Sequence, residues 1–145
     1  MKKMDIEKRK NRIRGFQKER DLVRKLWEMG FATIRAPASG AKAKKTYQPD
    51  IIAAKNNRIF VIEVKTRRAT DTVYVDSFQV SKLKEWSSRA GSNARCFIAV
   101  YFDRKIGWKF VPLEKAEVTK DGNIKVTKDL ASNSLSLDDL NNLTK

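Results

Sequence analysis

Residues 49–65 read PDIIAAKNNRIFVIEVK and carry the strongest structural pattern in the chain. Two apolar runs, residues 49–54 and 59–65, are separated by the polar sequence KNNR at residues 55–58. Short apolar runs bounded by turn residues predict strands, and a short Asn-containing turn between them predicts a β-hairpin. The second run is almost entirely apolar, which is typical of a central strand that is buried on both faces of a sheet.

Helices and further strands are predicted on both sides of this hairpin. Apolar residues at three- and four-residue steps predict helices over residues 15–29 and 76–90. Additional short apolar runs predict strands at residues 31–36, 95–102 and 107–112, with small strands near residues 117 and 124. The second helix lies between two strands in the manner of a parallel βαβ crossover. We therefore expect an α/β fold in which a central mixed β-sheet is flanked by helices.

Three parts of unequal size are predicted along the chain. Residues 1–14 form a basic N-terminal arm, residues 15–128 form the folded domain, and residues 129–145 form a C-terminal tail. Residues 37–48 within the domain lack any apolar period and predict a mobile basic loop. Two interpretations of the C-terminal tail stay open. It is either a polar extension or a short docking helix, whose apolar residues would be Leu135, Leu137, Leu140 and Leu143.

The net charge indicates a polyanionic partner. The 145 residues include 32 Lys and Arg but 17 Asp and Glu, which gives a formal net charge of +15. Such an excess on a folded domain opposes folding through self-repulsion, and it is typical of proteins that bind nucleic acid. An anionic membrane is a weaker candidate, because no strongly amphipathic helix with a basic face is evident.

Several classes of site are excluded by composition. The chain has no histidine, so Ser-His, Cys-His and His-metal mechanisms are excluded. Cys96 is the single cysteine and is expected to be a packing residue. No Gly-rich phosphate-binding loop indicates a nucleotide cofactor, and no apolar run approaches the ~18 residues of a membrane span. We expect a soluble cytoplasmic protein that associates with the nucleoid.

Three carboxylates occur where apolar residues are expected. Glu19 lies on the apolar stripe of the first predicted helix, which includes Leu26 and Trp27. Asp50 begins the first strand of the hairpin, and Glu63 interrupts the second. Buried carboxylates are costly unless they are paired or bind a metal ion.

Each acid also has an ordinary explanation. Glu19 could pair with a nearby Lys or Arg at the edge of its stripe, and Asp50 could be a turn residue. Glu63 and Lys65 could form the solvated end of a strand. One functional hypothesis nevertheless accounts for all of them together.

That hypothesis is a site for a hard divalent cation. Asp50 and Glu63, at the ends of adjacent strands, offer the oxygen ligands that Mg²⁺ prefers. The two-residue period of a strand places Lys65 on the same face as Glu63. There it could position a water molecule or stabilise negative charge on a phosphate.

The sequence resembles a known nuclease superfamily. Pro49-Asp50, twelve intervening residues and then Glu63-Val64-Lys65 resemble the PD-(D/E)xK motif of the restriction-endonuclease-like nucleases. The surroundings are similar to those of the archaeal Holliday junction resolvases over residues 15–112, about two thirds of the chain. The similar segments are residues 15–23, 30–35, 74–75, 86–89 and 107–110.

The resemblance implies roles for individual residues. Glu19, Asp50 and Glu63 would be the metal-site acids and Lys65 the catalytic lysine, with Mg²⁺ as cofactor and Mn²⁺ as its substitute. Ser39 would occupy the position of a serine that many members need for cleavage. The DNA-binding residues would be Arg20 and Arg35, together with the loop lysines Lys42, Lys44 and Lys45.

The resemblance also implies a substrate and an assembly. The family acts as a homodimer on four-way DNA junctions, and Phe78 and Trp86 are our candidates for the dimer surface. We therefore predict a structure-specific endonuclease that resolves Holliday junctions. Two alternatives stay open, namely a nuclease of the same fold that cuts another DNA structure or linear duplex, and a catalytically inactive DNA-binding module.

Overall fold

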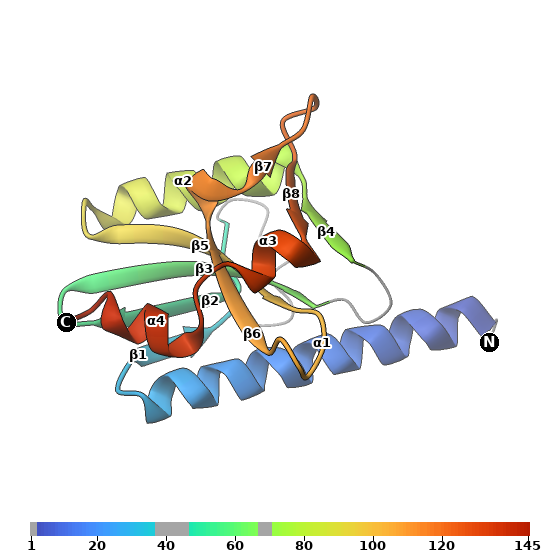
Figure 1. The fold of residues 1–145 in the computed structure, drawn as a ribbon, viewed down its shortest axis with the longest axis horizontal. Helices are drawn as coiled ribbons and strands as arrows, with labels where there is room; N and C mark the ends of the chain where they lie inside the picture. The colour runs from blue at the N-terminus through green and yellow to red at the C-terminus, as the bar shows by residue number, and fades with distance from the viewer. Residues whose placement is uncertain (1–2, 37–46, 67–70) are drawn as a thin grey trace.

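The structure is a computed structural model that describes residues 3–36, 47–66 and 71–145 (Figure 1). Its elements are α1 Lys3–Glu28, β1 Ala32–Arg35, β2 Ile51–Lys55, β3 Arg58–Thr66, β4 Thr72–Val75, α2 Ser77–Ala90, β5 Ala94–Tyr101, β6 Trp108–Pro112, the 3-10 helix η2 Leu113–Lys115, β7 Glu117–Val118, β8 Ile124–Thr127, α3 Lys128–Ser132 and α4 Leu137–Asn142. No helix in these ranges is long and apolar enough to cross a bilayer.

The main sheet has five strands in the order β1-β2-β3-β5-β6. Strands β2 and β3 form the predicted antiparallel hairpin, and β3 pairs in parallel with β5 through the predicted α2 crossover. Asn56 and Asn57 both adopt positive φ, at 50° and 64°, as a two-residue hairpin turn of the favoured hand requires. The mixed α/β fold and the central position of β3 are confirmed.

A second, small sheet has the order β4-β8-β7. The small strands expected near residues 117 and 124 correspond to β7 and β8. Strand β4 was not predicted; it pairs with β8 over the register Thr72↔Thr127 to Val75↔Ile124. Such a pairing joins segments about fifty residues apart, so no local pattern predicts it.

Apolar side chains pack on both faces of the main sheet. On one face, Phe60 and Ile62 of β3 pack in the same cluster as Leu22 and Leu26 of α1. On the other face, Val61 belongs to a cluster with residues of α2 and the small sheet. The predicted alternation of β3 is therefore confirmed, and Glu63 lies on the α2 side of the strand.

Helix α1 differs from the prediction in where it begins and in the exposure of Trp27. It begins at Lys3 rather than at residue 15, because the preceding segment is rich in Lys, Arg and Glu, which favour helix. Gly15 does not interrupt it, and an added Cβ there would lie 3.8 Å from the Thr66 hydroxyl. Trp27 was expected on the buried stripe but is 66% exposed, because it lies about 100° around the helix from Leu26.

The C-terminal segment docks onto the domain rather than extending from it. Leu140 of α4 is completely buried in the cluster that also contains α1 residues. Lys55 joins this helix to the end of α1, because its ammonium donates to the Met29 carbonyl and to Asn141 Oδ1, both at 2.7 Å. The docking-helix interpretation is confirmed.

Candidate active site

The hairpin brings Asp50 and Glu63 together. Its register pairs Ile51 with Ile62, so the next step of the ladder places Asp50 opposite Glu63. Directly opposed side chains of an antiparallel pair share a face, with Cβ atoms about 5 Å apart. Twelve residues separate the two acids in the sequence, and the hairpin with its two-residue turn brings them side by side.

Asp50 is fixed by two neighbouring strands. Its Oδ2 accepts a hydrogen bond from the backbone N–H of Val64 at 2.8 Å, and its backbone carbonyl accepts from Ala36 at 2.8 Å. The preceding Pro49 is buried. The carboxylate is thus anchored to β3, the strand that carries Glu63.

Glu63 is almost completely buried, with 5% of the residue exposed. The Tyr47 hydroxyl donates a hydrogen bond to Glu63 Oε1 at 2.9 Å. Tyr47 was not among the predicted site residues, because it lies in an aperiodic segment sixteen residues from Glu63. In the sequence, the only indication that Tyr47 belongs to the site is its position three residues before Asp50.

Lys65 lies two residues beyond Glu63 on the same face of β3. Its ammonium is 3.5 Å from Gln79 Oε1, a weak hydrogen bond that links it to the first turn of α2. Asp76 caps that turn by accepting from the Gln79 N–H at 2.8 Å. Gln79 was also not predicted, because its contact with Lys65 depends on how the crossover helix packs against the sheet.

Glu19 enters the site from α1. Its side chain is 16% exposed and is 3.4 Å from the Arg35 guanidinium. Glu19 thus faces the body of the protein, as predicted, and it also has the Arg partner that the ordinary explanation proposed. The Asp50 carboxylate is close enough to raise the pKa of Glu19.

All three acids resist ionisation. Burial raises the pKa of Glu63 to about 8, with a further rise from Asp50, whereas Lys65 and the Tyr47 hydroxyl oppose it. Burial also raises the pKa of Asp50, against the hydrogen bond from Val64. Burial and the Asp50 charge raise the pKa of Glu19 to about 7, while Arg35 lowers it. Adjacent carboxylates in a low dielectric cannot easily all be charged without a cation.

The donor set suits a hard divalent cation. Among the described residues, no group of three acidic, His or Cys side chains lies close enough to hold a metal ion as placed. The geometry instead offers the pair Asp50 and Glu63, with Glu19 near Asp50 and bound to Arg35. Mg²⁺ commonly binds one or two carboxylates and keeps several waters, so this pair fits that ion.

The predicted DNA-binding residues lie in different environments. Arg20 is exposed on α1, whereas Arg35 contacts Glu19 and lies 5.9 Å from the centre of the Phe16 ring. The other predicted positions lie outside the described residues, namely Ser39, Lys42, Lys44 and Lys45.

Comparisons with known proteins agree on one family. A family model described as archaeal Holliday junction resolvase (hjc) matches residues 10–145. The crossover junction endodeoxyribonuclease Hjc of Sulfurisphaera tokodaii is 35% identical over 130 residues, which cover 90% of this chain and 87% of the relative. The crossover junction endodeoxyribonuclease Hje of Sulfolobus acidocaldarius is 36% identical over 117 residues, 79% of this chain and 82% of the relative.

A solved structure agrees with the sequence relatives. The structure of Archaeoglobus fulgidus Hjc, a Holliday junction resolvase, superposes with a TM-score of 0.74 at 27% identity and covers 89% of this chain and 96% of that chain. The central mixed sheet with flanking helices is therefore the restriction-endonuclease-like fold. From its fold, its paired acids and the match over residues 10–145, this chain belongs to the archaeal Holliday junction resolvase family.

Proposed function

We propose that this chain is a metal-dependent endonuclease that resolves four-way DNA junctions by cutting two strands of opposite arms. The observation that carries the proposal is the hairpin pairing of Asp50 with Glu63, with Lys65 on the same face. Relatives of this chain are named crossover junction endodeoxyribonucleases, which supports the same reaction and substrate. A silent binding module would have no use for a buried Glu63 whose pKa is raised to about 8.

Asp50 and Glu63 would hold the cation, and Mg²⁺ is our choice, with Mn²⁺ as its substitute. When bound, such an ion supplies positive charge that polarises the phosphate and makes a water molecule easier to deprotonate. Glu19 supplies a third carboxylate beside Asp50 once it leaves Arg35. The released guanidinium is then available to a DNA phosphate, which would join DNA binding to completion of the site.

Lys65 contributes a second positive charge. Its ammonium is held near Gln79 of α2 and lies on the face of β3 that carries Glu63. There it stabilises negative charge that develops on the phosphate and orients the attacking water. Gln79 limits the directions that the flexible lysine side chain can take.

DNA binding in this proposal is electrostatic. A four-way junction is recognised through its shape and the positions of its phosphates, so no base-reading helix is required. The net charge of +15 supplies the attraction, with Arg20 exposed on the same helix as Glu19. We expect the enzyme to work on chromosomal DNA, in the cytoplasm and with the nucleoid.

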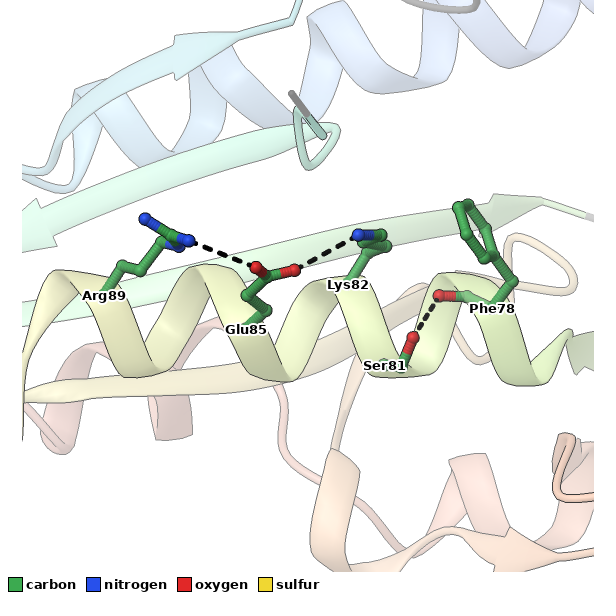
Figure 2. Close-up of polar contacts among 5 residues, drawn as sticks. All are labelled: Phe78, Ser81, Lys82, Glu85 and Arg89. Atoms are coloured by element: carbon green, nitrogen blue, oxygen red, sulfur yellow. Dashed lines mark hydrogen bonds and ion pairs between the residues drawn. The ribbon is translucent and has the colours of Figure 1, made fainter. Parts of the chain in front are cut away.

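The proposed assembly is a homodimer, which places two sites on two strands of the junction. Helix α2 offers a surface for it, and Figure 2 shows five residues of this helix with the polar contacts among them. Glu85 pairs with Lys82 and with Arg89 at 3.3 Å each, and the Ser81 hydroxyl donates to the Phe78 carbonyl. Phe78 is 67% exposed, and the Lys82 ammonium lies 5.5 Å from the centre of its ring.

Of the two candidate interface residues, Phe78 is the better one. Trp86 is half-buried and packs against the core cluster on the α2 side, so it contributes to the fold. Tyr74, on the neighbouring strand β4, is 55% exposed. Phe78→Arg is therefore expected to convert a dimer into monomers in size-exclusion chromatography with light scattering. Trp27→Arg, which changes an exposed aromatic residue of α1 in the same way, is expected to leave the mass unchanged.

The decisive experiment compares a synthetic four-way junction with its component linear duplexes, in Mg²⁺ and in EDTA at one salt concentration. We expect paired, symmetric cuts in the junction that require the metal. Cutting of linear duplex would retain the metal-site chemistry and overturn the substrate. Tight binding without cutting in Mg²⁺ or Mn²⁺ would favour the inactive binding module.

A further inference from the structure

The N-terminal turns of α1 extend beyond the rest of the domain. Figure 1 shows this end of the helix, in blue, projecting past the strands of the main sheet. Residues 5–10 and Ile13 are exposed, and the exposed segment contains three consecutive cations, Lys8, Arg9 and Lys10. The helix is continuous from Lys3 to Glu28, so these turns belong to the same rigid element as Glu19.

Helical geometry gives each of these cations a defined direction. An α-helix turns about 100° and rises about 1.5 Å per residue. Lys8 lies eleven residues before Glu19, about three complete turns, so the two side chains leave the same face about 16 Å apart. Gly15, near that face, approaches Thr66 at the end of β3, so the face is turned toward the candidate active site. Lys10 leaves the opposite face, about 180° from Glu19.

We infer that Lys8 binds a backbone phosphate of the DNA outside the cut site, about 16 Å from the scissile bond. This inference rests on the proposed function. A B-form strand rises about 3.4 Å per nucleotide and also winds around the axis, so a phosphate about 16 Å away in a straight line is about two to three nucleotides from the cut on the same strand. The helix thus fixes the position of one arm of the junction relative to the candidate active site.

Charge complementarity selects DNA as the occupant of this face. Lys8 is a compact ammonium on an exposed stem, which suits contact with a single phosphate. Asp5 shares the face one turn further out, and it is expected to mark the outer end of the contact by repelling the next phosphate. Glu7 leaves a different face, about 120° from Glu19.

The rigid helix makes a prediction that a flexible basic arm does not. A flexible arm would use Lys8 and Lys10 equally, because either ammonium could reach the DNA. A rigid helix directs only Lys8, of these two residues, toward the DNA. Lys8→Gln and Lys10→Gln remove the same charge, and Gln favours helix about as well as Lys, so they form a matched pair.

The experiment measures the affinity of the full chain for a synthetic four-way junction in EDTA, where no cutting is expected, over a range of salt concentrations. Lys8→Gln is expected to weaken binding several-fold and to lower the slope of log affinity against log salt by about 0.9 for each subunit that binds the junction. Lys10→Gln is expected to match the wild type. Equal losses in both variants, or no loss in either, would overturn the inference.

Two further measurements locate the contact. Replacing single phosphates by neutral methylphosphonates is expected to weaken wild-type binding about two to three nucleotides from the cut, and to have no effect there on Lys8→Gln. Asp5→Asn is expected to strengthen binding, whereas Glu7→Gln is not. Cleavage of the same junction by the wild type in Mg²⁺ is measured as a reference. If the wild type does not cut, the proposed function is refuted, whereas the role of Lys8 is judged from binding alone.

Discussion

The Asp50 carboxylate accepts a hydrogen bond from the backbone N–H of Val64 at 2.8 Å, across the open end of the β2–β3 hairpin. The contact fastens one candidate metal ligand to the strand that carries the other, Glu63. Under the proposed function, Asp50 therefore has two roles, as an acceptor that closes the hairpin and as a source of negative charge for a cation. The two roles can be separated by substitution.

Asp50→Asn is expected to abolish cleavage and to keep both the fold and junction affinity, because the amide oxygen can still accept from Val64. Asp50→Ala removes the acceptor as well, and a buried N–H left without a partner costs about 1–3 kcal/mol. Chemical denaturation should therefore separate the variants, while both are inactive in the cleavage assay. Wild-type cutting by Asp50→Asn would remove Asp50 from the metal site.

The stability of the metal-free protein is expected to fall as the pH rises from about 4.5 to about 8. Glu63 and Glu19 have folded pKa values of about 8 and about 7, above their ordinary value of 4.5. In this range the folded state keeps protons that the unfolded chain releases, so the free energy of unfolding decreases with pH. Their contribution is complete below pH 4.5 and lost above pH 8.

Thermal unfolding in EDTA measures this effect. Glu63→Gln is expected to reduce the decline between pH 5 and pH 8.5 to the part that Glu19 contributes. The exposed control Glu85→Gln is expected to keep the full decline, since the Glu85 pKa is lowered by its ion pairs. Added Mg²⁺ should raise the unfolding temperature more at pH 8.5 than at pH 6, because binding requires the carboxylates to lose their protons. An equal metal effect at both pH values would contradict the assignment.

Tyr47→Phe is expected to weaken metal binding about tenfold, as loss of a hydrogen bond to a metal ligand commonly does. The Tyr47 hydroxyl orients Glu63 Oε1 and lowers the pKa of that carboxyl, so its removal leaves a ligand that is less fixed and harder to ionise. Mn²⁺ titration followed by electron paramagnetic resonance measures the affinity without relying on activity. Tyr74→Phe, at an exposed tyrosine, is the control, and equal Mn²⁺ affinity in the two variants would deny Tyr47 this role.

Leu140→Ala is expected to cost about 2–5 kcal/mol of unfolding free energy, the usual range for a fully buried leucine. The loss should be larger than that of Leu143→Ala, because Leu143 is only partly buried against the same cluster. Urea unfolding of the two variants makes the comparison. A change below about 0.5 kcal/mol in Leu140→Ala would mean that α4 does not dock in solution, because surface substitutions have effects of that size.

Much of the site followed from local patterns. Asp50, Glu63 and Lys65 could be placed together because a two-residue turn fixes the pairing on both sides of it, and because strand side chains alternate. The βαβ crossover followed from the length of the intervening helix. Glu19 was found because a carboxylate on an apolar stripe is conspicuous in any single sequence. Mg²⁺ dependence, the role of Ser39 and the homodimer stay predictions.

Other features were outside the reach of the sequence. The pairing of β4 with β8, the exposure of Trp27 and the continuation of α1 to Lys3 were not predicted. The pairing of β4 with β8 joins strands far apart in the chain. The exposure of Trp27 depends on a small rotation around the helix, and the start of α1 depends on weak helix propensities that Gly15 obscures.

By itself, the sequence determined that Asp50, Glu63 and Lys65 lie together, because their order within one hairpin sets their spacing in space. Only the tertiary structure decided what holds them. Tyr47 reaches Glu63, Gln79 reaches Lys65 and Arg35 reaches Glu19 across fourteen to sixteen residues of chain. Such contacts depend on how the helices and loops pack against the sheet, because packing is decided by the whole set of buried side chains rather than by any local pattern.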